Sequence, residues 1–151
     1  MLAGLQGLSG VLMALLRRQT TGVGDYIDIS MEIAGEEIGS TLPIVHGVWA
    51  DGSLEAARVA RQAQRGGASA LLVFPPAPFA LGQSPEMALA HFKTISDASD
   101  LPIIVFQYPL ATGQGYPAAT LERLFDEVPT IRAIKDWTPL VPQHAGVAQG
   151  A

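Results

Sequence analysis

The chain contains no cysteine in its 151 residues. This absence excludes disulfide bonds, metal sites built from thiolates and catalysis by a cysteine nucleophile. Histidine is scarce as well, and the three histidines at positions 46, 91 and 144 are too scattered to have the spacing of metal ligands. We therefore expect no metal site and no thiol chemistry.

Charge is also sparse. Charged residues make up 15% of the chain, the formal net charge is −5, and the sequence has no run of basic residues. Proteins that bind nucleic acid carry basic patches, so we do not expect nucleic acid as a partner. The apolar share of 48% argues against disorder and suffices for the core of one ordinary domain.

The apolar segment at the start of the chain is too short to be a comfortable membrane span. Residues 1–16 are rich in Gly, Ala and Leu, whereas a spanning helix needs about 20 apolar residues. Arg17 and Arg18 follow this segment, but a secretory signal carries its positive charge before the apolar core. We interpret the segment as a buried helix, and we expect a cytoplasmic protein with no membrane partner.

What the sequence does contain is an alternation of strand and helix patterns. A helix is predicted at residues 2–19 and a strand at 26–30, followed by further strands at 42–48, 70–74, 102–108 and 131–135, with helices at 53–65, 85–98 and 117–127 between them. Residues 70–74 are apolar throughout, as in a strand of a parallel sheet buried on both faces. The order predicts an α/β fold of about five parallel strands alternating with helices, connected by right-handed crossovers.

Two serines are predicted to begin helices. Ser53 follows a turn and precedes a helical pattern, so we expect its side chain to cap that helix. Ser84 is followed by Pro85, and a capping residue followed by proline in the first turn is a strong helix start.

Lysine is the residue type that most clearly offers a candidate nucleophile. The chain has two lysines, Lys93 in a helical pattern and Lys135 at the end of the predicted strand 131–135. In a regular strand Lys135 would share a face with Ile131 and Ala133. These apolar neighbours would partly desolvate the amine and favour its neutral, nucleophilic form. The alternative is a structural lysine paired with a carboxylate such as Asp136.

Residues 38–139 resemble the dihydrodipicolinate synthase / N-acetylneuraminate lyase family. The pieces that carry the resemblance are residues 42–48, 65–76, 90–93, 100–105, Pro109, 112–113 and 131–136. That family has a (β/α)8 TIM-barrel fold, and its members form or cleave carbon–carbon bonds of pyruvate-derived substrates through a lysine Schiff base. The resemblance implies a partial TIM barrel, a small-molecule 2-keto acid as substrate and no cofactor, because the lysine iminium is itself the electron sink.

The resemblance also implies roles for individual residues. Lys135 matches the Schiff-base lysine of the family. The family's proton-shuttling tyrosine falls on Phe106, so we assign that role to Tyr108, which lies two residues further on the same strand face. The alternative for Tyr108 is a packed aromatic side chain. Phe106, Thr112 and Gly113 are assigned to substrate binding, with turn formation as the alternative for Thr112 and Gly113.

The sequence departs from the family pattern in the groups that would bind a substrate carboxylate. The family's arginine falls at Ala111, its tyrosine pair falls at Ala77 and Pro78, and its Gly-Thr-Thr-Gly-Glu loop has no counterpart. The similar segment 20–22 follows a helix and precedes a strand, which is the wrong context for that loop.

Residues 2–33 resemble a different family, the class III CoA-transferases. That family's catalytic aspartate would lie before Met1, so we interpret Asp25 and Asp28 as loop and strand-surface residues. We infer no transferase activity and expect no CoA binding.

These resemblances divide the chain into three parts. We predict a CoA-transferase-like helix–strand fragment at 1–33, a partial dihydrodipicolinate synthase-like barrel at 38–140 and a disordered tail at 141–151. A complete barrel needs about 250 residues, so we interpret the chain as truncated and fused. Two hypotheses remain: a Schiff-base lyase, or a non-catalytic fragment that self-associates. Open sheet edges predict a homo-oligomer.

Overall fold

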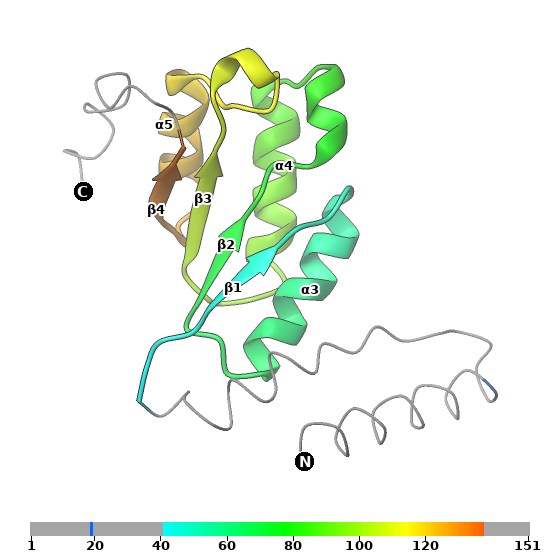
Figure 1. Cartoon of the computed structure of the whole chain (residues 1–151), viewed down its shortest axis with the longest axis vertical. Coiled ribbons are helices and arrows are strands. Elements are labelled where there is room, and N and C mark those ends of the chain that lie inside the picture. Colours follow the sequence, from blue (N-terminus) through cyan, green and yellow to red (C-terminus); the bar gives the residue numbers. More distant parts are fainter. Residues whose placement is uncertain (1–18, 20–40, 138–151) are drawn as a thin grey trace.

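The fold is a parallel sheet with helices between successive strands. The computed structural model describes Gln19 and residues 41–137 (Figure 1). The strands lie side by side in the order β1-β2-β3-β4, and all neighbouring pairs are parallel. The elements are β1 (Val45–Val48), α3 (Ser53–Arg65), β2 (Ala70–Val73), the short 3-10 helix η1 (Ala77–Leu81), α4 (Pro85–Ser96), β3 (Ile103–Gln107), η2 (Leu110–Thr112), α5 (Ala118–Glu127) and β4 (Ile131–Asp136).

The predicted alternation is confirmed for the described residues. Each of the four strands and three helices predicted there is present, with ends that differ by a few residues. The helix predicted at 2–19, the strand predicted at 26–30 and the tail at 141–151 lie outside the described residues, apart from Gln19. No helix in the described part of the chain is long and apolar enough to cross a membrane.

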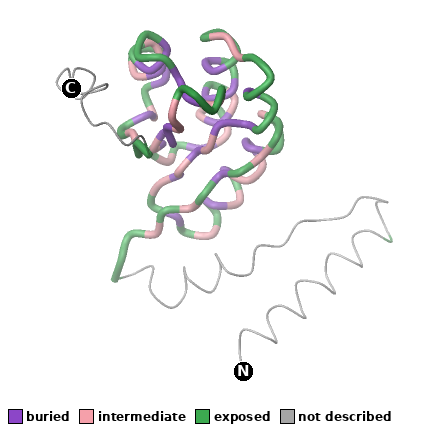
Figure 2. Tube along the Cα trace, turned by 45° about the horizontal axis from the view of Figure 1, so that its top comes forward, coloured by how far each residue is buried: buried purple, intermediate pink, exposed green. Residues whose placement is uncertain are grey.

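The hydrophobic core lies between one face of the sheet and the helices α3, α4 and α5, which all lie on that face (Figure 1). Alternate strand residues point into this core, because side chains alternate between the two faces of a strand. The apolar ones with at most 1% exposure are Val48, Leu71, Val73, Ile103 and Val105. In Figure 2 buried segments are spread over both the strands and the helices.

Small side chains bring α3 close to the sheet. Its buried positions are all alanine: Ala56, Ala57, Ala60 and Ala63. The cap predicted for this helix is wrong. Gly52 is the N-cap residue, and Ser53 is already helical, with its Oγ 3.0 Å from Nδ1 of His91 on α4. The serine therefore links two helices instead of capping one.

The start predicted for α4 is confirmed. Ser84 has extended backbone geometry, and its Oγ accepts a hydrogen bond from the Met87 amide at 3.2 Å. Pro85 follows at the first helical position, where its missing N–H costs nothing. The helix then buries Ala88, Leu89, His91, Phe92 and Ile95.

An irregularity in β4 changes which side chains share a face. Ile103 of β3 pairs with Ile131, but the next residue, Ile104, pairs with Ala133. Arg132 is thus one extra residue in β4, as in a β-bulge. Ile131 is in the core, whereas Lys135 lies beside Phe106 on the opposite face. The expectation that Ile131 and Lys135 share a face is wrong, and only Ala133 remains on the same side as the lysine.

Acid should destabilise the fold through His91. Its side chain is 1% exposed, and burial lowers its pKa to about 4 from about 6.5. A histidine whose folded pKa is depressed stabilises the fold above the unfolded pKa and loses that contribution as the pH falls. We expect the free energy of unfolding to decrease by about 3 kcal/mol between pH 6.5 and pH 4 on this account.

Urea denaturation at a series of pH values measures this loss. The variant His91→Gln should be less stable at pH 7 and should have a clearly shallower pH dependence between pH 6.5 and 4. His46→Gln is the matched control, because the His46 side chain is only partly buried. An unchanged slope in His91→Gln would contradict the prediction.

Candidate functional site

A row of aromatic side chains lies at the carboxyl end of the sheet, on the face away from the helices. Trp49 follows β1, Phe74 follows β2, Phe106 is in β3, Tyr108 follows β3 and Trp137 follows β4. The ring centroids are 5.1 Å apart for Trp49–Phe74, 4.5 Å for Phe74–Phe106 and 4.8 Å for Phe106–Tyr108. Trp137 lies 6.1 Å from Phe106 and 5.8 Å from Tyr108. The rings form a continuous apolar surface across the strands, which we call the aromatic row.

Lys135 projects onto this aromatic row. Its Nζ lies 4.4 Å from the centre of the Phe106 ring, an arrangement in which the ring face attracts the ammonium. The side chain is nonetheless exposed. The expected desolvation of the amine is therefore wrong for this structure, and the physical reason is that no described element covers this face of the sheet.

The alternative partner for the lysine, Asp136, is on the other face. Asp136 is opposite Gln107, whose side chain points into the helix layer, whereas Lys135 is opposite Phe106. Adjacent residues of a strand point to opposite sides. The structure therefore joins Lys135 to an aromatic ring rather than to its neighbouring carboxylate.

Tyr108 lies where the sequence places it. It follows β3 two residues after Phe106, is half-buried, and packs its ring against Phe106 and Trp137. Both Tyr108 and Lys135 thus contact the ring of Phe106. The packed aromatic that we considered as the alternative is present, and it leaves the phenol at the same end of the sheet as the amine.

Thr112 and Gly113 form a turn. The Thr112 hydroxyl donates a hydrogen bond to the Pro109 carbonyl at 2.8 Å and accepts one from the Gln114 amide at 3.2 Å. Gly113 has a φ of 74°, in the left-handed region that favours glycine. The turn-forming alternative therefore accounts for the contacts of both residues.

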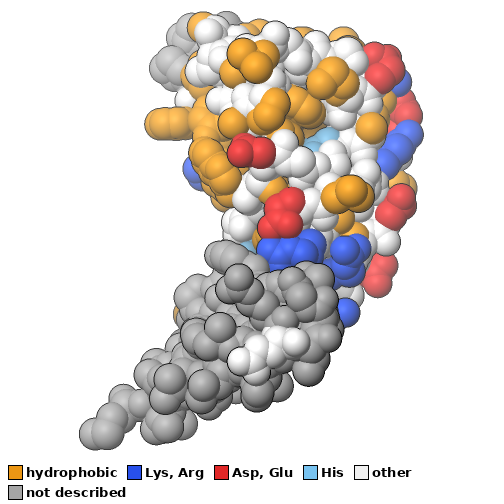
Figure 3. Space-filling model, turned by 90° about the vertical axis from the view of Figure 1, so that its right-hand side faces the viewer, with side chains coloured by type: hydrophobic (Ala, Val, Ile, Leu, Met, Phe, Trp, Pro, Cys, Tyr) orange, Lys and Arg blue, Asp and Glu red, His pale blue; other side chains and the backbone are white. Residues whose placement is uncertain are grey.

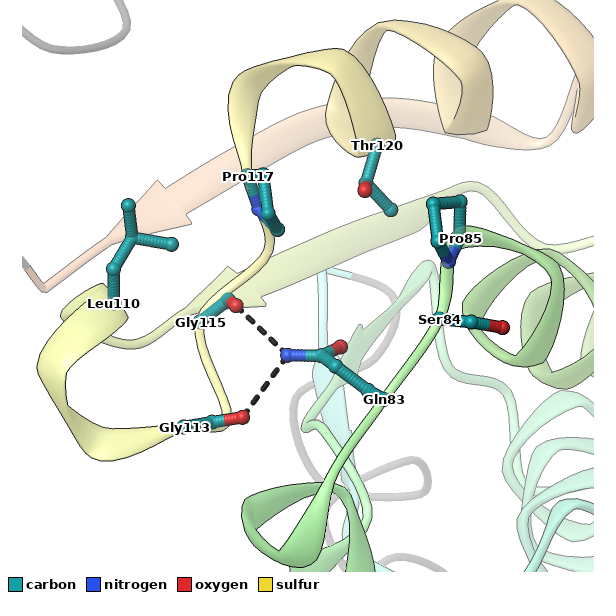
Figure 4. A pocket seen from close by; sticks show the side chains of 8 residues that line it. All are labelled: Gln83, Ser84, Pro85, Leu110, Gly113, Gly115, Pro117 and Thr120. Atoms are coloured by element: carbon teal, nitrogen blue, oxygen red, sulfur yellow. Dashed lines mark hydrogen bonds between the residues drawn. The ribbon is translucent and has the colours of Figure 1, made fainter.

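A shallow pocket lies beside this turn. Gln83 donates hydrogen bonds to the carbonyls of Gly113, at 3.0 Å, and Gly115, at 2.8 Å (Figure 4). The pocket has a volume of about 350 Å³ and is bordered by the first turns of α4 and α5. Its lining is mostly apolar and contains none of the residues of the aromatic row.

Gln107 holds the backbone that follows the turn. Its side-chain Nε2 donates to the Tyr116 carbonyl at 3.0 Å, and its Oε1 accepts from the Tyr116 amide at 3.0 Å. Gln107 and Tyr116 are both completely buried. Sequence reasoning missed this pair, although a glutamine at the end of an apolar strand was a usable signal, because a buried amide needs partners.

Close backbone packing completes the support of Tyr108. A Cβ atom at Gly115 would collide with the Tyr108 carbonyl oxygen. Only glycine allows this approach. The segment 115–116 thus packs against the end of β3 on the helix side of the sheet, while the aromatic row lies on the other side.

The histidine and the second described tyrosine near this end are not alternative acid–base groups. Burial lowers the pKa of His91 and raises that of Tyr116, so both side chains are held neutral in the helix layer. In the described ranges, Gln19 and 41–137, no group of three or more His, Asp or Glu residues could hold a metal ion.

The fold and the position of the lysine define a class of protein. The sheet has the features of a segment of a (β/α)8 barrel: its strands are parallel and the helices between them lie on one face. Lys135 lies at the carboxyl end of β4, and the active sites of such barrels lie at that end. The model of the dihydrodipicolinate synthetase family matches residues 20–149. The chain therefore belongs to the dihydrodipicolinate synthetase family.

Curated relatives named 4-hydroxy-tetrahydrodipicolinate synthase are similar to this chain. A 4-hydroxy-tetrahydrodipicolinate synthase from Sphingopyxis alaskensis is 38% identical over 110 residues, which are 73% of this chain and 35% of the relative. The enzyme of the same name from Rhizobium meliloti is 31% identical over 108 residues, covering 72% of this chain and 36% of the relative. The chain thus spans about a third of the length of these relatives.

Solved structures show the same fold. A dihydrodipicolinate synthase from Agrobacterium tumefaciens is similar with a TM-score of 0.62 and 30% identity, over 71% of this chain and 35% of that one. YagE from E. coli K12, a prophage protein of the dihydrodipicolinic acid synthase family solved in complex with pyruvate, reaches a TM-score of 0.68 at 24% identity. It covers 76% of this chain and 38% of its own. A partial barrel is confirmed.

The family match begins earlier than the predicted boundary. We expected the barrel part to begin at residue 38, whereas the match begins at residue 20. Residues 20–33 therefore fall inside the family match. The resemblance of residues 2–33 to class III CoA-transferases stays a prediction.

Proposed function

We propose that this chain carries the site of a lyase or aldolase that forms a Schiff base between Lys135 and pyruvate or a related 2-keto acid. The observation that carries the proposal is the place of the Lys135 amine, over the ring of Phe106 at the carboxyl end of a parallel sheet, in a chain of this family. Family membership also supports a catalytic role over a non-catalytic fragment. A cytoplasmic location is part of the proposal.

The chemistry follows from the amine and its neighbours. The neutral amine of Lys135 adds to the keto carbon, and uptake of one proton with loss of one water gives an iminium. The iminium withdraws electrons, so a proton can leave the adjacent carbon and an enamine forms. The enamine attacks an aldehyde to make a carbon–carbon bond, or forms when such a bond is cleaved. The aromatic row supplies an apolar surface against which the 2-keto acid can pack.

Trapping the iminium tests the proposal. The protein is incubated with pyruvate and sodium borohydride, which reduces an iminium to a stable amine, and the adduct is mapped by mass spectrometry. Lys93 is an internal control, because it lies on the helix layer 2.7 Å from Glu127. We expect the adduct on Lys135 and none on Lys93. If the folded protein carries no adduct on Lys135, the proposed chemistry is wrong.

Tyr108 is proposed to move the proton. The variant Tyr108→Phe keeps a ring that can pack against Phe106 and Trp137 but removes the hydroxyl. We expect it to form the borohydride adduct as before, while exchange of the pyruvate methyl protons for deuterium, followed by NMR, slows about 100-fold or more. Exchange at the original rate would leave Tyr108 as a packed aromatic alone.

A further inference from the structure

We propose that Trp137 selects the substrate, and that the carbon chain carried by Lys135 ends in an aromatic ring, as it does when the aldehyde partner is an aryl aldehyde. This inference rests on the proposed function, because the substrate must be joined to the Lys135 amine. The starting observation is that Lys135 and Trp137 lie two residues apart at the end of one strand, and both lie against the ring of Phe106.

Trp137 is held in position by the backbone of β3. Its amide donates a hydrogen bond to the Gln107 carbonyl at 3.0 Å, which continues the pairing with β3 beyond the end of β4. Side chains two residues apart on a strand share a face, so the indole lies on the same face as Lys135. Its ring centre is 6.1 Å from that of Phe106 and 5.8 Å from that of Tyr108. The indole therefore borders both the amine and the phenol of the proposed site.

A substrate bound to Lys135 reaches this indole through few bonds. In the iminium the keto carbon is joined to Nζ, and the adjacent carbon forms the new bond to the aldehyde carbon. The aldehyde carbon is thus three bonds from Nζ, at most about 4 Å, and its substituent begins one bond further. Nζ itself is 4.4 Å from the centre of the Phe106 ring. This neighbourhood is set by β3 and β4 and is independent of what lies opposite the sheet.

The side chains around Phe106 offer rings and few polar groups. Phe74, Tyr108 and Trp137 have ring centres 4.5, 4.8 and 6.1 Å from that of Phe106. Aromatic rings attract one another in offset and tilted arrangements beyond the effect of buried area. A carboxylate or hydroxyl group placed against these rings would lose its hydrogen bonds to water without replacement. The position therefore favours an aromatic substituent over a charged or hydroxylated one.

Ion pairs occupy the helix layer instead. One lies within α3 and two join α4 to α5: Arg58–Glu55, Lys93–Glu127 and Arg123–Glu86. Figure 3, which views the molecule from the side of β1 and α3, shows hydrophobic side chains along one margin and most charged side chains toward the other. These paired charges lie on the opposite side of the sheet from Lys135, so they cannot bind the far end of a substrate held by its amine.

Carbon–carbon bond formation with an aryl aldehyde needs no further reactant than water. The enamine carbon gives its electron pair to the carbonyl carbon of the aldehyde, one carbon–carbon bond forms, and the aldehyde oxygen takes up one proton. One water then hydrolyses the iminium. This step frees the Lys135 amine, returns the proton taken up when the iminium formed, and releases a 4-hydroxy-2-keto acid with an aromatic ring on carbon 4.

Three 2-keto acids that differ only beyond carbon 4 test the preference. 2-Oxo-4-phenylbutanoate, 2-oxopentanoate and 2-oxoglutarate share the first four carbons and end in a phenyl, a methyl and a carboxylate group. Each is trapped on Lys135 with sodium cyanoborohydride, and the concentration that gives half-maximal labelling is measured by mass spectrometry. We expect this concentration to be about 10- to 100-fold lower for the phenyl compound than for 2-oxopentanoate, and highest for 2-oxoglutarate.

Variants of the two tryptophans assign the preference to one side chain. Trp137→Ala should reduce the ratio to about threefold or less, the advantage that remains for the larger apolar group, whereas Trp137→Phe keeps a ring and should retain most of it. Trp49→Ala is the matched control and should behave as the unsubstituted chain, because Trp49 follows β1, three strand spacings or about 14 Å from β4. An unchanged ratio in Trp137→Ala, or equal half-maximal concentrations of the three acids in the unsubstituted chain, overturns the inference.

Pyruvate separates this inference from the proposed function. Pyruvate ends at carbon 3, so its adduct on Lys135 does not depend on Trp137. If pyruvate labels Lys135 and the phenyl compound has no advantage, the substrate preference is wrong and the Schiff-base function stands. If none of the four acids labels Lys135, the function and the inference are both wrong.

Discussion

Replacing Lys135 by arginine is expected to abolish the borohydride adduct with pyruvate and to reduce methyl-proton exchange of pyruvate to the level without protein. Arginine keeps the positive charge and can still stack on Phe106, but its guanidinium does not deprotonate and cannot form the iminium. Because the iminium is the only proposed electron sink, the expected loss of rate is at least about 1,000-fold.

The matched control is Lys93→Arg, the same substitution at the other lysine of the chain. It keeps a charged partner for Glu127 on the helix layer, so the exchange rate and the adduct should both be retained. The exchange assay needs no aldehyde, which makes it independent of the second substrate. If Lys135→Arg retains the exchange and Lys93→Arg loses it, the wrong lysine has been assigned.

Replacing Gln107 by alanine is expected to cost about 4 kcal/mol of unfolding free energy. The substitution removes two hydrogen bonds and leaves both the amide and the carbonyl of Tyr116 without their partner in a completely buried place. An unsatisfied buried backbone group costs about 1–3 kcal/mol, and the cavity left by the side chain adds to this. Urea denaturation at pH 7 measures the change.

Two further variants sharpen this prediction. Gln114→Ala removes one long hydrogen bond of 3.5 Å to the Pro76 carbonyl, so it should cost less than about 1 kcal/mol. Gln107→Glu keeps an acceptor for the Tyr116 amide but turns a second oxygen toward the Tyr116 carbonyl. We expect it to be strongly destabilised at neutral pH and partly restored in mild acid, where the protonated carboxyl can donate. Equal stability of the Gln107→Ala and Gln114→Ala variants would show that the two hydrogen bonds of Gln107 to the Tyr116 backbone do not stabilise the fold as expected.

The sequence predicts the strands and helices of the described part well, because apolar periodicity indicates their type and glycine and proline residues mark their ends. Ser84 and Pro85 begin α4 as expected, and the apolar run at 70–74 is a buried parallel strand. Ser53 was predicted wrongly because its hydroxyl finds a partner on another helix, His91, which no local pattern indicates.

The sequence predicts where Lys135 and Tyr108 lie on the sheet but not what surrounds them. The resemblance put Lys135 and Tyr108 at one end of the sheet, and they lie there around Phe106. The exposure of the amine could not be predicted, because burial depends on what covers the other face of the sheet. The hydrogen bonds between Gln107 and the Tyr116 backbone were also missed, since Tyr116 belongs to a loop without periodicity.

The bulge at Arg132 in β4 determines on which face of the sheet the Lys135 amine lies relative to Ile131. Deleting Arg132 would restore regular alternation and leave the lysine beside Phe106, whereas a strand of the same length without the bulge would turn the lysine toward the helix layer. Alignments that ignore the inserted position would assign the wrong side to every following side chain.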